Sequence, residues 1–139
     1  MATKFEDIRG FLGLEYIVLT NVPIRDTQFG EVIDVKPNVL ENITARAIIT
    51  HRVPIRGKEV KFLRKTLGLS LERFASEIKL TSGSIFKWER AADERLHPIN
   101  EIAVRAFVAE QLNIDLSGKY SELVASKEFP KEIVLNTSE

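Results

Sequence analysis

Residues 56–89, RGKEVKFLRKTLGLSLERFASEIKLTSGSIFKWE, carry the clearest helical pattern of the chain. Val60, Leu63 and Leu67 recur three and four residues apart, which places them on one face of a helix whose other positions are largely basic. Gly68 follows, and glycine is the residue that most readily ends a helix. The pattern therefore predicts a first amphipathic helix that ends there.

Two shorter helices are expected after it. Ser70 and Thr81 are both suitable N-cap residues, because their hydroxyls can accept a hydrogen bond from a backbone N–H of the first turn. The two residues before Thr81 form the turn between the helices. In the helix that follows Thr81, Ile85 and Trp88 are the apolar pair expected to face inward.

Charge is unevenly distributed along the chain, although the 20 basic and 20 acidic residues cancel overall. Residues 46–90 contain eleven Lys or Arg and four Asp or Glu, a net charge of +7, whereas residues 1–45 carry −3 and residues 91–139 carry −4. A basic segment between acidic ends is typical of proteins that contact phosphates. Solvated helix surfaces are the other interpretation of the same charges.

The N-terminal part is expected to form a β-hairpin and a connecting helix. Residues 14–24 and 31–35 are rich in β-branched and aromatic residues, and residues 25–30 suit a longer loop between two strands. Residues 37–51 have helical apolar spacing and begin with a proline. Residues 52–56, with a proline in their midst, mark a break before the next helix.

Residues 99–112 and residues 113–139 each allow two interpretations. Residues 99–112 form a helix with two apolar stripes, of which the second lies either in a subunit interface or beneath the N-terminal unit. Residues 113–139 contain a possible helix after Ser117 and a β-prone run at 132–136. That tail either attracts a basic protein partner or adds a strand to the hairpin.

These patterns predict an α+β fold that is mainly α. Residues 1–51 would form the hairpin unit with its connecting helix, residues 52–112 a helix-turn-helix DNA-binding and dimerisation domain, and residues 113–139 an acidic tail. In such a domain the last of the three short helices exposes side chains to the DNA major groove while its back packs on the other two.

The stretch from Arg56 to Glu89 resembles the helix-turn-helix of the phage-repressor (Xre/Cro) superfamily. The combination of LRKTLGLS, an FA pair, a capped turn and IFKWE carries this resemblance. Residues 14–48, LEYIVLTNVPIRDTQFGEVIDVKPNVLENITARAI, look like the N-terminal part of MqsA-type (YgiT-type) antitoxins. In these antitoxins a zinc-binding hairpin leads through a helix into the same motif.

Four positions depart from the family pattern. The zinc-binding CxxCG motif is represented by Asp26 and Phe29 before Gly30, and the chain contains no cysteine, so the zinc site is not carried over. Leu71 stands where the superfamily often has a phosphate-contacting glutamine, and Gly83 stands where a polar reader is common. Lys87 matches a basic position that contacts DNA in the family.

The resemblance implies an antitoxin of a type II toxin–antitoxin pair that represses its own operon. It would bind a palindromic double-stranded DNA operator as a homodimer and bind a toxin through another surface. Lys87 is expected to reach a guanine or a phosphate, the serines near the helix N-terminus to donate to phosphate, and the basic residues of the first helix to line the DNA backbone. The expected contacts are Ser82, Gly83, Ser84, Phe86, Lys87, Arg90, Arg56, Lys58, Lys61 and Arg64.

Other function classes lack support in the sequence. There is no cysteine for a disulfide or thiolate site, no Gly-rich phosphate loop, no HExxH and no nucleophile motif, so we expect no enzyme, metal or cofactor. No long apolar run or signal-like start is present, which favours a cytoplasmic protein. Two alternatives to the antitoxin stay open: a transcriptional regulator without a toxin, and a degenerate helix-turn-helix interaction module, suggested by Leu71 and Gly83.

Overall fold

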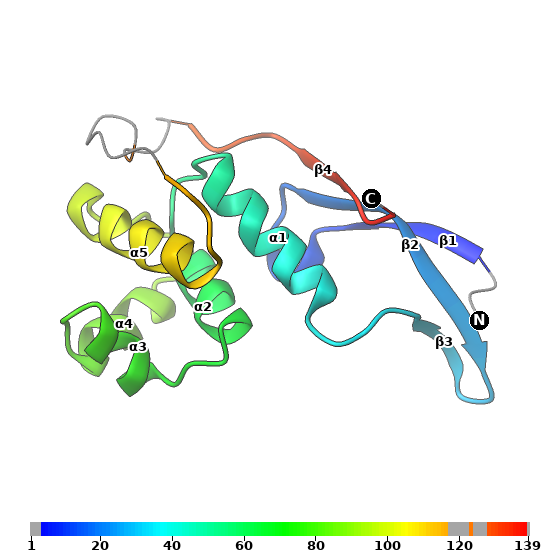
Figure 1. Cartoon of the computed structure of the whole chain (residues 1–139), viewed down its shortest axis with the longest axis horizontal. Helices are drawn as coiled ribbons and strands as arrows, with labels where there is room; N and C mark the ends of the chain where they lie inside the picture. Colours follow the sequence, from blue (N-terminus) through cyan, green and yellow to red (C-terminus); the bar gives the residue numbers. More distant parts are fainter. Residues whose placement is uncertain (1–3, 117–122, 124–127, 139) are drawn as a thin grey trace. The chain divides into compact units, whose positions relative to one another are not determined.

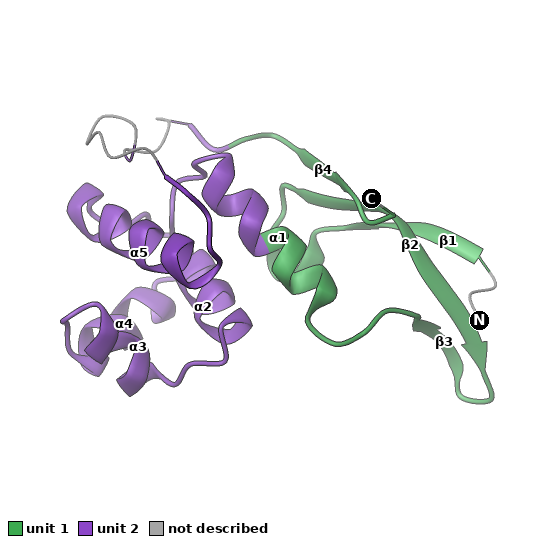
Figure 2. Ribbon diagram, in the orientation of Figure 1, with its two compact units in different colours: residues 1–44, 130–139 green, residues 45–129 purple. Residues whose placement is uncertain are grey.

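The computed structural model describes residues 4–116, 123 and 128–138, and the protein belongs to the α+β class. Within these residues it has five α-helices and one four-stranded sheet (Figure 1). Contacts divide the chain into two compact units, residues 1–44 with 130–139 and residues 45–129 (Figure 2). No helix in the described part of the chain is long and apolar enough to cross a membrane.

The sheet of the first unit is built on one long strand. This strand, β2 (Ile17–Thr27), pairs antiparallel with β1 (Lys4–Arg9) and with β3 (Gly30–Ile33). The fourth strand, β4 (Ile133–Asn136), comes from the other end of the sequence and pairs parallel with the start of β2. Buried apolar side chains explain the central position of β2: Ile17, Val18, Leu19, Val22 and Ile24 are all nearly inaccessible to solvent.

The predicted hairpin is confirmed, but its loop is shorter than expected. Thr27 pairs directly with Gly30, which leaves only two residues in the turn instead of the loop predicted over residues 25–30. The Thr27 hydroxyl donates to the Gly30 carbonyl at 2.7 Å and accepts from the Phe29 amide at 3.1 Å. Gly30 has a φ of 112°, a conformation that glycine adopts without strain.

The sequence indicated β4 but not β1. β1 was not predicted, because its sequence, KFEDIR, lacks the regular alternation of apolar and polar residues that indicates a half-buried strand. Almost all of its residues are exposed. β4 corresponds to the alternative in which residues 132–136 add a strand. The strand is anchored by Ile133, whose amide donates to the Tyr16 carbonyl at 2.7 Å. The helix expected after Ser117 lies outside the described residues.

Helix α1 (Val39–Thr50) confirms the predicted connecting helix. The boundary between the two units falls within it, between Thr44 and Ala45. This division differs from the three predicted segments, because β4 joins the C-terminal residues to the sheet of the first unit rather than leaving them as a separate tail.

After the end of α1, the second unit contains the three predicted short helices, and all three are confirmed. They are α2 (Gly57–Thr66), α3 (Leu71–Glu77) and α4 (Ser82–Arg90). Both expected caps are present: the Ser70 hydroxyl accepts from the Arg73 amide at 3.1 Å, and the Thr81 hydroxyl accepts from the Ser84 amide at 3.2 Å. These bonds satisfy N–H groups that have no partner within the helix.

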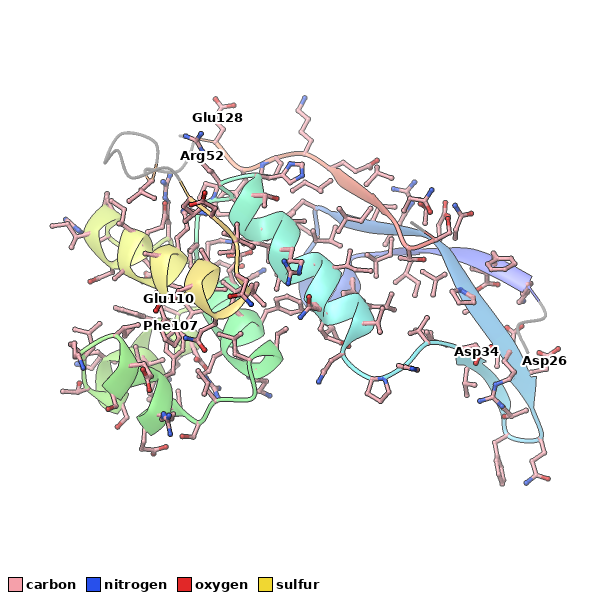
Figure 3. All side chains as sticks on the ribbon, viewed as in Figure 1. Asp26, Asp34, Arg52, Phe107, Glu110 and Glu128 are labelled. Carbon is pink, nitrogen blue, oxygen red and sulfur yellow. The ribbon has the colours of Figure 1, made fainter. Side chains whose placement is uncertain are left out.

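Helix α5 (Pro98–Gln111) completes the second unit. One of its two apolar stripes, which includes Val104 and Val108, is fully buried. Phe107 lies on α5 (Figure 3). Its ring contacts the Phe74 ring of α3 edge to face, with the ring centroids 5.7 Å apart. The second stripe is only partly open: Ile99 at its beginning is 64% exposed and Ala106 is exposed, whereas Ile102, Ala103 and Phe107 are half-buried.

Candidate nucleic-acid interface

Helix α4 presents one face to solvent. Gly83, Phe86, Lys87 and Arg90 are exposed, and their spacing of three and four residues places them on the same side of the helix. Ile85, on the opposite side, is fully buried. Four of the residues predicted to contact DNA are therefore brought together on one surface.

The two predicted serines lie at the beginning of this helix and are half-buried. Ser82 is the first helical residue, and Ser84 is hydrogen-bonded to the cap through both its amide and its hydroxyl, the latter 3.0 Å from the Thr81 hydroxyl. The helix N-terminus carries partial positive charge, which suits an anion. The hydrogen bonds between Ser84 and Thr81 therefore stabilise the beginning of α4.

Trp88 is less buried than its spacing predicted. It is half-buried rather than core, whereas Phe74 of α3 is completely inaccessible and fills the space between the helices. Together with Lys87 and His97, Trp88 borders a surface hollow of about 300 Å³ within this unit. The remaining lining residues are Ala91, Glu94, Arg95, Leu96 and Asn100.

Two contacts fix α4 on α2. The Arg64 guanidinium donates to both carboxylate oxygens of Glu89, at 2.7 and 2.9 Å, and also to the Leu69 carbonyl at 2.9 Å. The hydrogen bonds to Glu89 raise the pKa of Arg64 above its usual value. At the other contact, a Cβ atom on Gly57 would overlap the carbonyl oxygen of Trp88, so only glycine permits this approach of the two helices.

The segment before α2 is hydrogen-bonded to the segment after α4. Leu96 donates its amide to the Ile55 carbonyl at 2.9 Å, and Lys58 donates its amide to the Ala92 carbonyl at 3.0 Å. Each end of the three-helix arrangement is therefore held through the backbone. The exposed face of α4 rests on a rigid support, which reduces the entropy lost when the face binds a partner.

Lys58 and Lys61 of α2 remain near the surface. Lys61 is exposed, while Lys58 is half-buried and forms an ion pair of 2.7 Å with Asp93, which lowers the pKa of the Asp93 carboxyl. Lys65, not among the expected contacts, is also exposed. In the part of the chain that the structure describes, neither Lys61, Lys65, Lys87 nor Arg90 belongs to an ion pair.

Arg56 and Arg64 lie elsewhere, contrary to the expectation that they line a nucleic-acid backbone. Arg56 is buried, donates to Glu59 through Nε and Nη2 at 2.9 and 2.6 Å, and stacks its guanidinium 4.2 Å from the centre of the Phe129 ring. The donors of Arg64 are occupied by Glu89 and Leu69. Both arginines hold the domain together, and neither is available to a phosphate.

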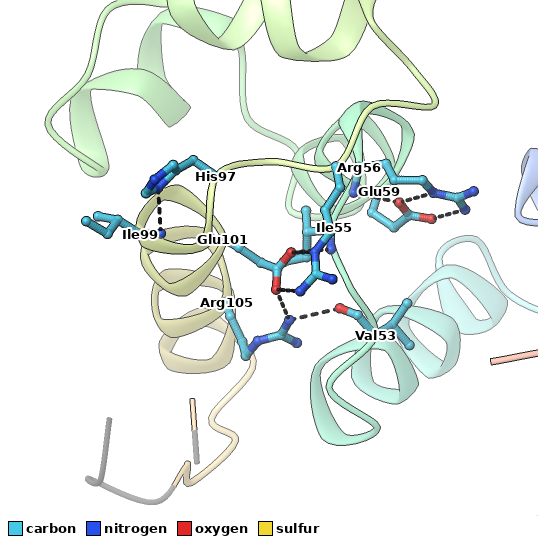
Figure 4. Close-up of polar contacts among 9 residues, drawn as sticks. Val53, Ile55, Arg56, Glu59, His97, Ile99, Glu101 and Arg105 are labelled. Atoms are coloured by element: carbon cyan, nitrogen blue, oxygen red, sulfur yellow. Dashed lines mark hydrogen bonds and ion pairs between the residues drawn. The ribbon is translucent and has the colours of Figure 1, made fainter. Parts of the chain in front are cut away.

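A second group of charged residues, centred on the buried Glu101 and Arg105, was not predicted from the sequence (Figure 4). Glu101 of α5 accepts from the Ile55 amide at 2.9 Å and from the Arg95 guanidinium at 3.0 and 3.1 Å. Arg105, completely buried, donates to the Val53 carbonyl at 2.8 Å and lies 3.5 Å from Glu101. Desolvation lowers the pKa of Arg105. The helical spacing of Glu101 and Arg105 was the available sequence signal.

Among the residues that the structure describes, no three His, Asp or Glu side chains are placed to hold a metal ion. Comparisons of the chain with protein-family models, with curated proteins and with solved structures find no match.

Proposed function

We propose that the protein is a sequence-specific DNA-binding transcriptional regulator in which α3 and α4 act as a helix-turn-helix. The observation that carries this proposal is the exposed face of α4, formed by Gly83, Phe86, Lys87 and Arg90. A helix that enters the major groove needs such a face, together with a back that packs firmly on its neighbours. The buried Ile85 and the Arg64–Glu89 pair supply that packing.

The distribution of charge supports the same function. Lys87 and Arg90 of α4 and Lys61 and Lys65 of α2 are exposed cations that can neutralise phosphates. They belong to the segment of net charge +7 in a chain that is neutral overall. A binding face concentrated in one segment explains how a neutral protein can bind a polyanion.

A homodimer on a palindromic operator is the expected assembly. Two recognition helices that enter successive major grooves on one side of DNA lie one helical turn apart, roughly 34 Å. The exposed beginning of the second α5 stripe, at Ile99, offers an apolar surface for a second copy. Sedimentation at micromolar concentration measures the oligomeric state directly. A protein that is monomeric both when free and when bound to DNA would contradict the expected dimer.

An antitoxin function is the more specific form of the proposal, and it depends on the resemblance of residues 14–48 to the N-terminal part of MqsA-type antitoxins. The protein would then act in the cytoplasm and bind a toxin outside the α4 face. A regulator without a toxin is the alternative. Co-purification with the product of a neighbouring short gene favours the antitoxin, whereas DNA binding without such a partner favours the alternative.

Fluorescence anisotropy tests the DNA-binding function. The purified protein is titrated onto a labelled duplex from the region upstream of its own gene, and onto a scrambled duplex, over a series of salt concentrations. We expect tighter binding to the natural duplex and a linear fall of log affinity with log salt, by about 0.9 for each phosphate contacted. Equal or absent binding to both duplexes at low salt would favour a protein-interaction module instead.

A further inference from the structure

An aromatic side chain stands in the middle of the exposed face of α4. Phe86 is 52% exposed, and it lies between Gly83 on one side and Lys87 and Arg90 on the other. About half of the side chain therefore remains accessible to a partner. Burial of the ring against a partner would be favourable. The charges of the residues around the ring indicate what kind of partner this is.

Those neighbours favour a polyanion over an apolar protein surface. Lys87 and Arg90 are exposed and belong to no ion pair within the described residues. The one acidic side chain of α4, Glu89, is engaged by both donating ends of Arg64. The face therefore carries two positive charges around the ring, and α4 itself places no free carboxylate beside them.

Gly83 gives the ring room to approach a flat surface. A Cβ atom at Gly83 would meet only the Thr81 hydroxyl, at 3.9 Å, so packing within the protein does not require glycine at this position. Side chains on a helix lean toward its N-terminus, and Phe86 therefore leans over the turn that contains Gly83. The missing side chain leaves the ring uncovered on that side.

The floor of the DNA major groove exposes one apolar group, the C5-methyl of thymine. We infer that Phe86 contacts a thymine methyl group and so selects a T·A pair at one position of each half-site, while Lys87 beside it binds a base acceptor or a phosphate. This inference depends on the proposed DNA-binding function and adds to it the base feature that the α4 face recognises.

Replacement of thymine by deoxyuridine tests the inference without changing the protein. The wild-type protein first selects its preferred duplex from a random pool, and that duplex is then synthesised with thymine or with deoxyuridine throughout. We expect the uracil duplex to bind at least about four-fold more weakly, the factor that corresponds to the burial of one methyl-sized group. Phe86→Ala should bind both duplexes equally.

Phe29→Ala is the matched control, because Phe29 is 90% exposed in the β2–β3 turn and the substitution removes the same ring. This variant should keep the wild-type difference between the two duplexes. Equal binding of the two duplexes by the wild type overturns the role of Phe86 but leaves DNA binding intact. A difference that persists in Phe86→Ala also overturns it, because uracil then acts through DNA shape. Selection of no duplex at all overturns the proposed function, and this inference with it.

Discussion

The Arg64 guanidinium of α2 holds both carboxylate oxygens of Glu89 of α4, at 2.7 and 2.9 Å, in a pair whose side chains are only 11% and 8% exposed. The two residues are 25 positions apart in sequence. A bidentate pair of this kind sets orientation as well as distance, since two parallel hydrogen bonds hold the planar groups together. It therefore fixes the direction in which the exposed face of α4 points.

Removal of one member of this pair should destabilise the domain. Arg64→Met leaves the Glu89 carboxylate in a poorly solvated position without its cation, and we expect the free energy of unfolding to fall by about 3 to 5 kcal/mol. Urea denaturation measures the change. The matched control is Arg73→Ala, which removes the exposed Arg73–Glu77 pair of α3 and should cost less than about 1 kcal/mol. Similar losses in the two variants would mean that the Arg64–Glu89 pair contributes no more than a surface pair.

Gly57→Ala should destabilise the same domain through the backbone. The added methyl group would overlap the Trp88 carbonyl, and separation of α2 from α4 would cost about 3 kcal/mol, at the upper end for overpacking. Gly83→Ala provides the control, because its methyl group meets open space and alanine favours a helix by about 0.5 to 1 kcal/mol. Thermal unfolding should show opposite shifts. A stable Gly57→Ala variant would show that the two helices can separate without cost.

Ile133→Ala should weaken the sheet of the first unit. Ile133 is buried and pairs with Ile17 of β2, so its truncation is expected to cost about 2 to 5 kcal/mol. Val134 is the next residue of the same strand and is 55% exposed, and Val134→Ala should change the stability by less than about 0.5 kcal/mol. Chemical denaturation of both variants compares them. Equal effects would indicate that β4 is not docked on β2 in solution.

Lys87→Ala should weaken DNA binding with no effect on folding. The side chain is exposed on α4, so the melting temperature should not change. Loss of one phosphate contact lowers the slope of log affinity against log salt by about 1, whereas loss of a base contact lowers affinity mainly for the preferred sequence. Lys131→Ala, which removes an exposed lysine outside the basic segment, is the control and should bind as the wild type does. Unchanged affinity of Lys87→Ala would exclude Lys87 from the interface.

Most of the local structure of the second unit was predictable from sequence. Helical periodicity and cap chemistry act over a few residues, so Ser70 and Thr81 identified the beginnings of α3 and α4 correctly. The hairpin of β2 and β3 was predictable for the same reason. Trp88 shows the limit of periodicity, since helical spacing indicates a face but not how completely that face is covered.

The arrangement of distant segments was not predictable in this way. Arg64 had the same basic character as Lys61, and only its partner in space, Glu89, which lies 25 positions further along the chain, withdraws it from the surface. Local sequence likewise suggested that residues 132–136 could form a strand, but not a parallel register with Ile17 over a separation of more than 110 residues. Charge and β-propensity are properties of single residues and short runs, whereas burial, ion pairing and strand register arise only when distant parts of the chain exclude water between them.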